Sequence, residues 1–333
     1  MTTTQAPRIA LTFGDFSGIG PELAVRLLAD PETLAQAQIS ALVSADELQQ
    51  AADAAGVTVP VGEQPGVGHV HLVGSRLQDV AVPSKEVSVA AGRRVMSDLE
   101  QALAMFGEGS VDSIMFLPLN KSALHDAGMH EEDELRWFAK QLDFGGFTSE
   151  LNFAPGLTTA RVTSHIALSE VSRNISARGV RDATKLLHQV IQGTGVETPR
   201  IAVAALNPHA GENGQFGREE IDHIAPGVEL AREVDGIEVS GPFPCDTVFI
   251  RAKRGDFDGV VTMYHDQGQI AMKLMGFDQG VTVQGGLPVP IATPAHGTAY
   301  EIVGQNKALM GPTQRAFEIA VGLGRQTAQR RAA

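Results

Sequence analysis

IALTFGDFSGIGPELAVRLL, residues 9–28, joins a predicted strand to a predicted helix through a glycine-rich bend. The apolar run from Ile9 to Phe13 predicts a buried strand. Pro21 and Glu22 after the glycines are typical of a first helical turn, because proline lacks no needed hydrogen bond there and glutamate favours the positive end of the helix dipole. This segment therefore predicts a strand that turns directly into a helix.

The same alternation continues along the chain. Strand-like runs at 39–43 and 114–117 are followed by helical patterns at 45–55 and 122–127. Residues 57–82 lack periodicity and predict irregular connections or short edge strands. Repeated strand and helix patterns favour a layered α/β fold with mainly parallel strands.

Composition limits the classes of partner. The chain has 333 residues, 43% of them hydrophobic, which is enough for a sizeable core in two domains or one large one. A net charge of −13 without a long basic block gives no electrostatic footprint for nucleic acid. The single cysteine, Cys245, excludes an intrachain disulfide and suits a reducing compartment. With no signal core and no membrane-length apolar run, we expect a cytoplasmic protein with no membrane partner.

Three histidines in loops after apolar runs predict a metal site. The runs are 159–162, 201–206 and 260–263, and the histidines are His165, His209 and His265. Parallel strands deliver polar residues at their carboxyl ends in this way. Three imidazoles without clustered cysteine suit a borderline divalent ion with an open coordination position. Each histidine taken alone is more often an ordinary loop residue, and the three must converge through the fold. Asp246 and Asp266 are candidates for orienting them or for transferring a proton.

Seven blocks, in this order along the chain, carry a family resemblance: Gly14 to Glu22, Pro118 to Lys121, Thr163 to Ile166, Asn207 to Glu212, Gly241 to Thr247, Tyr264 to Gly268 and His296 to Ala299. With these blocks the chain resembles the 4-hydroxythreonine-4-phosphate dehydrogenase family of pyridoxal phosphate (pyridoxine-type) biosynthesis, including paralogues that act on other small hydroxy acids. The resemblance implies an NAD-dependent, divalent-metal-dependent oxidation of a secondary alcohol, with decarboxylation of a β-keto product left open. It implies that His165, His209 and His265 bind Zn²⁺, Co²⁺, Ni²⁺, Mn²⁺ or Mg²⁺ and come from both subunits of a homodimer.

The resemblance also implies a fold. The implied fold is similar to the isocitrate/isopropylmalate dehydrogenase architecture, which has two α/β domains and a cleft between them. We expect residues 1–128 and 290–333 to form the cofactor-side domain. Residues 129–289 are expected to form the central domain that carries the dimer interface and the metal site.

Two segments are candidates for the dinucleotide site. The spacing in Gly14 to Gly20 is wrong for the usual G-x-G-x-x-G fingerprint, which disfavours a Rossmann site and leaves a packing bend or a ligand contact. His296 to Gly304 resembles the adenosine-binding loop of isopropylmalate-type dehydrogenases, and an acidic residue near the ribose favours NAD over NADP, although Lys307 blurs that preference. The cofactor-binding candidates in this loop are His296, Gly297, Thr298 and Glu301.

The general base stays open among three residues. Lys121 follows an apolar run and Asn120, and an amine near a cation loses its proton readily. Asp246 and Asp266 are the alternatives. For the substrate, Lys273 matches the family's substrate-contacting lysine, and Asn120 lies beside the candidate base.

The chain departs from the family where substrate is bound. The family's His-Thr-Glu motif is replaced by Glu134-Leu135-Arg136, an asparagine by Thr282 and an arginine by Ile291. Arg136 either restores a positive charge or pairs with a glutamate on a helix. Loss of a bidentate cation weakens the case for a phosphate in the usual place, so a different hydroxy acid or a dihydrodiol carboxylate fits comparably well. A metal-dependent hydrolase or lyase and a catalytically silent binding protein are the competing classes.

Overall fold

The computed structural model describes residues 6–276 and 279–332. The chain divides into two compact units. Unit 1 contains the described residues up to 131 together with those from 288 onward, and unit 2 contains residues 132–287. Within the described ranges, no helix combines the length and apolarity needed to cross a membrane.

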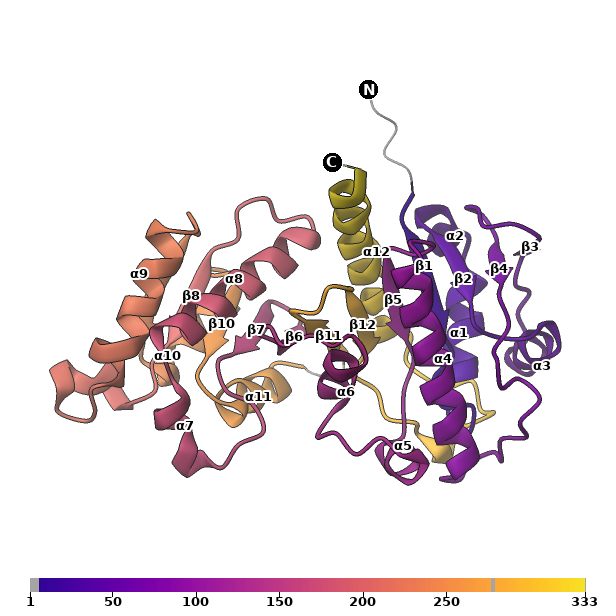
Figure 1. The fold of residues 1–333 in the computed structure, drawn as a ribbon, viewed down its shortest axis with the longest axis horizontal. Helices are drawn as coiled ribbons and strands as arrows, with labels where there is room; N and C mark the ends of the chain where they lie inside the picture. The colour runs from indigo at the N-terminus through magenta and orange to yellow at the C-terminus, as the bar shows by residue number, and fades with distance from the viewer. Residues whose placement is uncertain (1–5, 277–278, 333) are drawn as a thin grey trace. The chain divides into compact units, whose positions relative to one another are not determined.

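Unit 1 is built on parallel strands in the order β3-β4-β2-β1-β5-β12 (Figure 1). Their bounds are β1 Arg8–Thr12, β2 Gln38–Ala41, β3 Val61–Gly62, β4 Val70–Leu72, β5 Ser113–Phe116 and β12 Ile291–Pro294. Ile9 of β1 pairs with Ile39 of β2, and both side chains are fully buried. The predicted strand, bend and helix at residues 9–28 are confirmed, and residues 57–82 contain only the short strands β3 and β4.

The helices of unit 1 follow the predicted alternation. They are α1 Gly20–Leu28, α2 Pro31–Gln36, α3 Ala45–Ala55, α4 Val89–Gly107, α5 Lys121–Ala127, the 3₁₀ turn η4 Tyr300–Ile302 and α12 Gly311–Ala332. Helix α4 packs on β1 and β5, and α12 packs on β5 and β12. Helix α3 begins with a capping box, in which the Ser44 hydroxyl accepts from the Glu47 N–H and the Glu47 carboxylate accepts from the Ser44 N–H.

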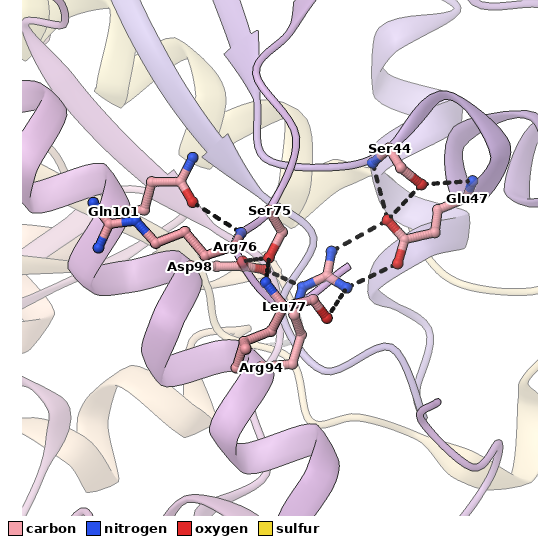
Figure 2. A network of polar contacts seen from close by, with 8 residues as sticks. All are labelled: Ser44, Glu47, Ser75, Arg76, Leu77, Arg94, Asp98 and Gln101. Atoms are coloured by element: carbon pink, nitrogen blue, oxygen red, sulfur yellow. Dashed lines mark hydrogen bonds and ion pairs between the residues drawn. The ribbon is translucent and has the colours of Figure 1, made fainter. Parts of the chain in front are cut away.

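A buried network of charges joins α3, α4 and the loop after β4 (Figure 2). The Arg94 guanidinium lies 2.9 Å from Asp98 and 2.8 Å from Glu47, and the Ser75 hydroxyl donates to Asp98. Arg94 also stacks over the ring of Phe16, 4.6 Å from its centroid. Burial raises the pKa of Asp98 to about 6, although the Arg94 charge acts in the opposite direction. The network therefore fixes three separate segments of unit 1 around one guanidinium.

Asp98→Asn isolates the pH dependence of this carboxyl. In the folded protein Asp98 holds a proton up to a pH of about 6, well above the range of an unfolded aspartate. Between those two pKa values the folded state binds more protons, so the contribution of Asp98 to stability falls as pH rises. We expect the free energy of unfolding of the wild type, relative to Asp98→Asn, to decrease by on the order of 3 kcal/mol between about pH 4 and pH 7. Urea unfolding across this range measures the difference, and a constant difference would contradict the expectation.

Unit 2 has the strand order β11-β6-β7-β10-β8-β9. Strands β7, β10, β8 and β9 are parallel, and β6 runs antiparallel to both β7 and β11. The bounds are β6 Ser149–Ala154, β7 Leu157–Arg161, β8 Ile201–Ala204, β9 Val239–Phe243, β10 Gly259–Thr262 and β11 Val281–Gly285. The helical elements are α6 Glu134–Gln141, α7 Leu168–Asn174, α8 Ala177–Gly193, η1 Pro208–Gly214, η2 Glu220–Ile224, α9 Ala225–Glu233, α10 Cys245–Lys253 and α11 His265–Leu274.

The order of strands in unit 2 places the three predicted histidine loops at one edge. Strands β7, β10 and β8 are neighbours and parallel, and each is followed in the chain by one of these loops. The carboxyl ends of parallel neighbours share an edge of the sheet, which is where open α/β sheets bind ligands. The fold therefore places the three histidine-bearing segments after the carboxyl ends of neighbouring strands.

Candidate metal and substrate site

Two of the three histidines are close neighbours. His165 lies in the loop after β7, and His265 is the first residue of α11. Their ring centroids are 5.5 Å apart with the planes inclined by 46°. Both rings line a pocket of about 290 Å³, whose other lining residues are Ser164, Ile166, Leu168, Val171, Tyr264 and Asp266.

A carboxylate lies beside Nδ1 of each ring. Oδ2 of Asp133 is 3.0 Å from Nδ1 of His165, and Oδ1 of Asp266 is hydrogen-bonded to Nδ1 of His265 at 2.7 Å. An acceptor at Nδ1 favours the tautomer that carries its proton there and leaves the lone pair on Nε2. The pair thus has the donor chemistry of two ligands to a borderline divalent ion, which fits the predicted metal.

His209 is held in an unusual turn after β8. The backbone is left-handed at four non-glycine residues in succession around Gly211, namely His209, Ala210, Glu212 and Asn213. Left-handed backbone costs about 1–2 kcal/mol for an L-residue and persists only where the surroundings impose it. The buried Glu220 carboxylate accepts from the N–H groups of Leu206 and Asn207, both at 2.8 Å, and from the Asn207 side chain at 2.9 Å. Glu220 therefore anchors the start of the turn.

One chain does not by itself complete the predicted ligand set. Among the residues that the structure describes, no three histidine, cysteine or acidic side chains gather closely enough to hold a metal ion. The ring of His209 lies against Phe216, with centroids 6.2 Å apart. The three-histidine site therefore stays a prediction, in which a second subunit supplies part of the set.

The two acidic candidates line a second, apolar pocket. Asp246 lies in the first turn of α10 and Asp266 in the first turn of α11. Both line a pocket of about 410 Å³ between these helices, together with Tyr264 and several aliphatic side chains. Burial raises the pKa of Tyr264, and Cys245 and Asp266 add to the effect, so its hydroxyl is kept protonated.

The substrate candidates in unit 2 lie on three elements. Arg136 on α6 is exposed, and its guanidinium donates to the Thr148 hydroxyl at 2.9 Å, so this contact leaves its charge unneutralised. Thr282 on β11 accepts from the Asn152 amide at 3.3 Å. Lys273 lies exposed near the end of α11, the helix that begins with His265.

The remaining candidates belong to unit 1. Asn120 caps α5 by accepting from the Ala123 N–H at 2.9 Å, and Lys121 is the exposed first residue of that helix. In the candidate cofactor loop, His296 Nε2 lies 3.2 Å from the Leu309 carbonyl. A side chain at Gly297 would meet open space, and Glu301 is exposed.

The candidate cofactor loop is attached to the glycine-rich bend. The buried Thr298 accepts from the Ile19 N–H at 3.0 Å through its carbonyl, and Tyr300 donates to Asp15 at 2.9 Å. Burial, with the hydrogen bond to Asp15, raises the pKa of Tyr300 to about 12, which keeps it a donor. A Cβ on Gly18 would lie 2.6 Å from the Thr298 carbonyl, so glycine is required for this approach.

The bend itself is explained by packing. The N–H groups of Asp15, Ser17 and Gly18 donate to acceptors within the protein at 2.8–3.0 Å. Gly14 is left-handed, and a Cβ there would lie 2.4 Å from the Leu117 carbonyl. These contacts favour the packing interpretation of the bend over a direct ligand contact.

The sequence alone predicts no role for Asp133, Glu220 or Tyr300. Asp133 is the N-cap of α6 in the structure, and its proximity to His165 depends on tertiary structure. The Glu220 contacts likewise join residues from separate segments. Tyr300 lies inside the candidate cofactor loop that the sequence predicts. Its hydrogen bond to Asp15, 285 residues away in the chain, becomes visible only in the folded structure.

Comparison with known proteins identifies the family. The model described as "Pyridoxal phosphate biosynthetic protein PdxA" matches residues 23–320. A Pseudomonas aeruginosa protein provisionally named 4-hydroxythreonine-4-phosphate dehydrogenase 2 is 47% identical over 340 residues, covering 98% of this chain and 100% of its own. D-threonate 4-phosphate dehydrogenase of Cupriavidus necator is 37% identical, with 98% of each chain covered.

Solved structures agree with the architecture. The 4-hydroxythreonine-4-phosphate dehydrogenase of Klebsiella pneumoniae is 31% identical with a TM-score of 0.80, over 97% of this chain and 100% of its own. A terephthalate 1,2-cis-dihydrodiol dehydrogenase of Burkholderia xenovorans is 27% identical with a TM-score of 0.74, over 96% and 98%. At 14% identity and a TM-score of 0.51, over 92% and 80%, a β-decarboxylating dehydrogenase of Thermococcus kodakarensis shares the fold alone. The predicted α/β class, similar to isocitrate and isopropylmalate dehydrogenases, is confirmed, and the chain belongs to the PdxA family of dehydrogenases.

Proposed function

We propose that the protein oxidises the secondary alcohol of a small phosphorylated hydroxy acid, using NAD and a divalent metal ion. The observation that carries the proposal is the His165–His265 pair at the carboxyl edge of the unit 2 strands, with a carboxylate beside each Nδ1. The names of the relatives, which refer to 4-hydroxythreonine 4-phosphate and D-threonate 4-phosphate, support a phosphorylated substrate.

Within this proposal the chain's residues hold and orient the reactants. His165, His209 and His265 hold the ion, and Asp266 orients His265 through Nδ1. When bound, the ion supplies the Lewis acidity that lowers the pKa of the alcohol and would polarise a β-keto product for decarboxylation. Asp246 and Lys121, both exposed, are the candidates for accepting the alcohol proton, because Asp266 is engaged with His265. Asn120, Lys273, Thr282 and Arg136 are the proposed substrate contacts.

The proposed cofactor site is the loop of unit 1 that contains His296, Gly297, Thr298 and Glu301. Residues up to 128 and from 290 onward form the proposed cofactor-side domain, with the metal site and dimer interface in the central part. The open space at Gly297 and the exposed Glu301 support a nucleotide contact there, since an acidic side chain near a ribose favours NAD.

Tyr300→Phe is expected to weaken NAD⁺ binding while leaving the fold intact. The substitution removes the hydrogen bond to Asp15 that holds the loop to the bend, and leaves a buried carboxylate one donor short. A loss of about 1.5–3 kcal/mol for a hydrogen bond to a charged group corresponds to an affinity decrease of roughly tenfold or more. Isothermal titration with NAD⁺ measures it, with Ser110→Ala as the control, because that change removes an exposed hydroxyl of unit 1 that is bonded to the Met105 carbonyl. Equal affinities in all three proteins would contradict the proposed site.

An exposed apolar surface on α10 and α11 supports a homodimer. Ile250, Ile270 and Leu274 are 52%, 61% and 83% exposed, and they lie around the apolar pocket between these helices. Contiguous exposed apolar side chains of this kind mark interaction sites. The surface adjoins the His165–His265 pocket, because Tyr264 and Asp266 line both, so a second copy seated there would bring residues to the metal site.

Leu274→Asp is expected to weaken the dimer. Burial of a leucine side chain stabilises an interface by about 1.5–3 kcal/mol, and twofold symmetry doubles the effect. We therefore expect the dimer dissociation constant to rise at least about 100-fold, measured by analytical ultracentrifugation. Val61→Asp, at a valine of unit 1 that is 53% exposed, is the control. A dimer that persists in Leu274→Asp with unchanged affinity would place the interface elsewhere.

A dihydrodiol carboxylate is the second candidate substrate. The similarity to the terephthalate dihydrodiol dehydrogenase supports it. So does Ile291, which is fully buried in β12 at the position where the family resemblance calls for an arginine. A buried isoleucine offers no charge to a phosphate, whereas it is compatible with an uncharged ring.

The formation of NADH tests the proposed function. The protein is supplied with NAD⁺, each of several divalent ions and a panel containing D-threonate 4-phosphate, 4-hydroxythreonine 4-phosphate, their unphosphorylated forms and a dihydrodiol carboxylate. The expected result is metal-dependent absorbance at the NADH wavelength with a phosphorylated substrate, abolished by a chelator. Turnover without NADH would support a hydrolase or lyase instead. Tight binding without turnover across the panel would support a silent binding protein.

A further inference from the structure

Asp133 makes two contacts with its two carboxylate oxygens. Its side chain is 3% exposed, and the residue is the N-cap of α6. Oδ1 accepts from the Arg136 N–H at 2.8 Å, and Oδ2 lies 3.0 Å from Nδ1 of His165. One buried carboxylate therefore begins a helix and faces a candidate metal ligand.

The cap fixes the direction of the second oxygen. Because Oδ1 is bonded to the first turn of α6, the carboxylate cannot rotate without losing that bond. The helix is itself anchored by Trp137 and Phe138, which are 2% and 0% exposed. His165, in contrast, lies in a loop with a side chain 35% exposed. The rigid partner in this pair is the aspartate, and the movable one is the imidazole.

The comparison with His265 shows why Asp133 matters more than its counterpart. The partner of His265 is Asp266, the next residue in the chain, whose side chain is 73% exposed. Water competes with an exposed carboxylate and screens its charge, whereas a buried one acts in a medium of lower dielectric constant. Of the two carboxylates, Asp133 is the stronger constraint on a ring.

We propose that Asp133 is a positioning residue that holds the proton of His165 on Nδ1 and so presents Nε2 as the metal-binding atom. The inference rests on the proposed metal site and deepens it. It also couples His165 to the start of α6, the segment where the chain departs from the family's His-Thr-Glu motif. A substrate that shifts α6 would then shift the orientation of His165 as well.

Two substitutions separate the roles of the two oxygens. Asp133→Asn keeps a capping oxygen for Arg136 but turns an amide N–H toward Nδ1, which forces the proton of His165 onto Nε2 and blocks that atom. Asp133→Ser keeps the cap and is too short to reach the ring. Asp30→Ser makes the same change at the N-cap of α2 in unit 1, where Asp30 accepts from the Glu32 N–H at 3.0 Å, and serves as the control.

The experiment measures Zn²⁺ affinity by calorimetry on the full chain, and the His165 tautomer by ¹⁵N NMR on metal-free protein, assigned against His165→Ala. We expect about 10–100-fold weaker Zn²⁺ binding in Asp133→Ser, an equal or larger loss in Asp133→Asn, and wild-type affinity in Asp30→Ser. The wild-type ring is expected to be protonated on Nδ1 and the Asp133→Asn ring on Nε2.

Each result has one consequence. Wild-type affinity in Asp133→Asn, or a wild-type His165 protonated on Nε2, would overturn the role of Asp133. If His165→Ala binds Zn²⁺ as tightly as the wild type, the proposed metal site fails instead. Should Asp133→Ser fail to fold, the tautomer in the wild type and the affinity of the cap-preserving Asp133→Asn still decide the question.

Discussion

His265→Ala is expected to leave the protein folded and to abolish its metal-dependent oxidation. His265 begins α11, its side chain is 39% exposed, and its ring contacts His165 and Asp266, so the methyl replacement disturbs no apolar core. Charge stabilisation by a metal is worth several kilocalories per mole, so loss of a ligand is expected to lower turnover by at least about 10³-fold. Bound metal, measured by mass spectrometry after dialysis, is expected to fall in parallel.

The control for this substitution is another exposed histidine. His125 in α5 is 70% exposed and faces solvent in unit 1, so His125→Ala is expected to retain both metal and activity. His209→Ala extends the test to the ligand that a single chain does not bring to the pair. Unchanged metal content in both His265→Ala and His209→Ala would remove these histidines from the ligand set.

Arg94→Ala is expected to destabilise the protein by about 3–5 kcal/mol, the usual result of removing one partner from a buried ion pair. The guanidinium is 1% exposed and forms ion pairs with both Asp98 and Glu47, and its removal leaves Asp98 buried without a cation. It also removes the stacking on Phe16, which belongs to the glycine-rich bend. Chemical denaturation measures the loss.

Arg93→Ala is the matched control for this substitution. Arg93 is the preceding residue of α4 and is exposed, so its replacement is expected to change the free energy of unfolding by less than about 0.5 kcal/mol. If Arg94→Ala is as stable as Arg93→Ala, the network in Figure 2 contributes no net stability.

Individual helices and strands could be predicted from the sequence because capping residues and apolar patterns lie within the elements themselves. The predicted helix at 45–55 has those bounds in the structure, where Ser44 and Glu47 form the capping box. The predicted strand from Ile9 to Phe13 is β1, Arg8–Thr12. The short strands within 57–82 were harder to place, since neither has enough residues to show a period.

Only part of the candidate site could be predicted from the sequence. Apolar runs before His165, His209 and His265 predicted loops at strand ends, but the adjacency of β7, β10 and β8 depends on the order of strands in space. Glu220 accepts from the backbone just before the left-handed turn at His209, and Asp133 lies 3.0 Å from Nδ1 of His165; no local pattern encodes these tertiary contacts. Contacts of this kind depend on the fold, whereas the three histidines proposed as ligands can be picked out from the sequence alone.

A crystal structure of the protein soaked with Zn²⁺, with the ion located by anomalous scattering, tests the central claim most directly. We predict one ion per chain, about 2.0–2.1 Å from Nε2 of His165, His209 and His265, with the three rings contributed by two subunits. An ion bound away from these rings, or rings too far apart in the assembled dimer to reach one ion, would contradict it.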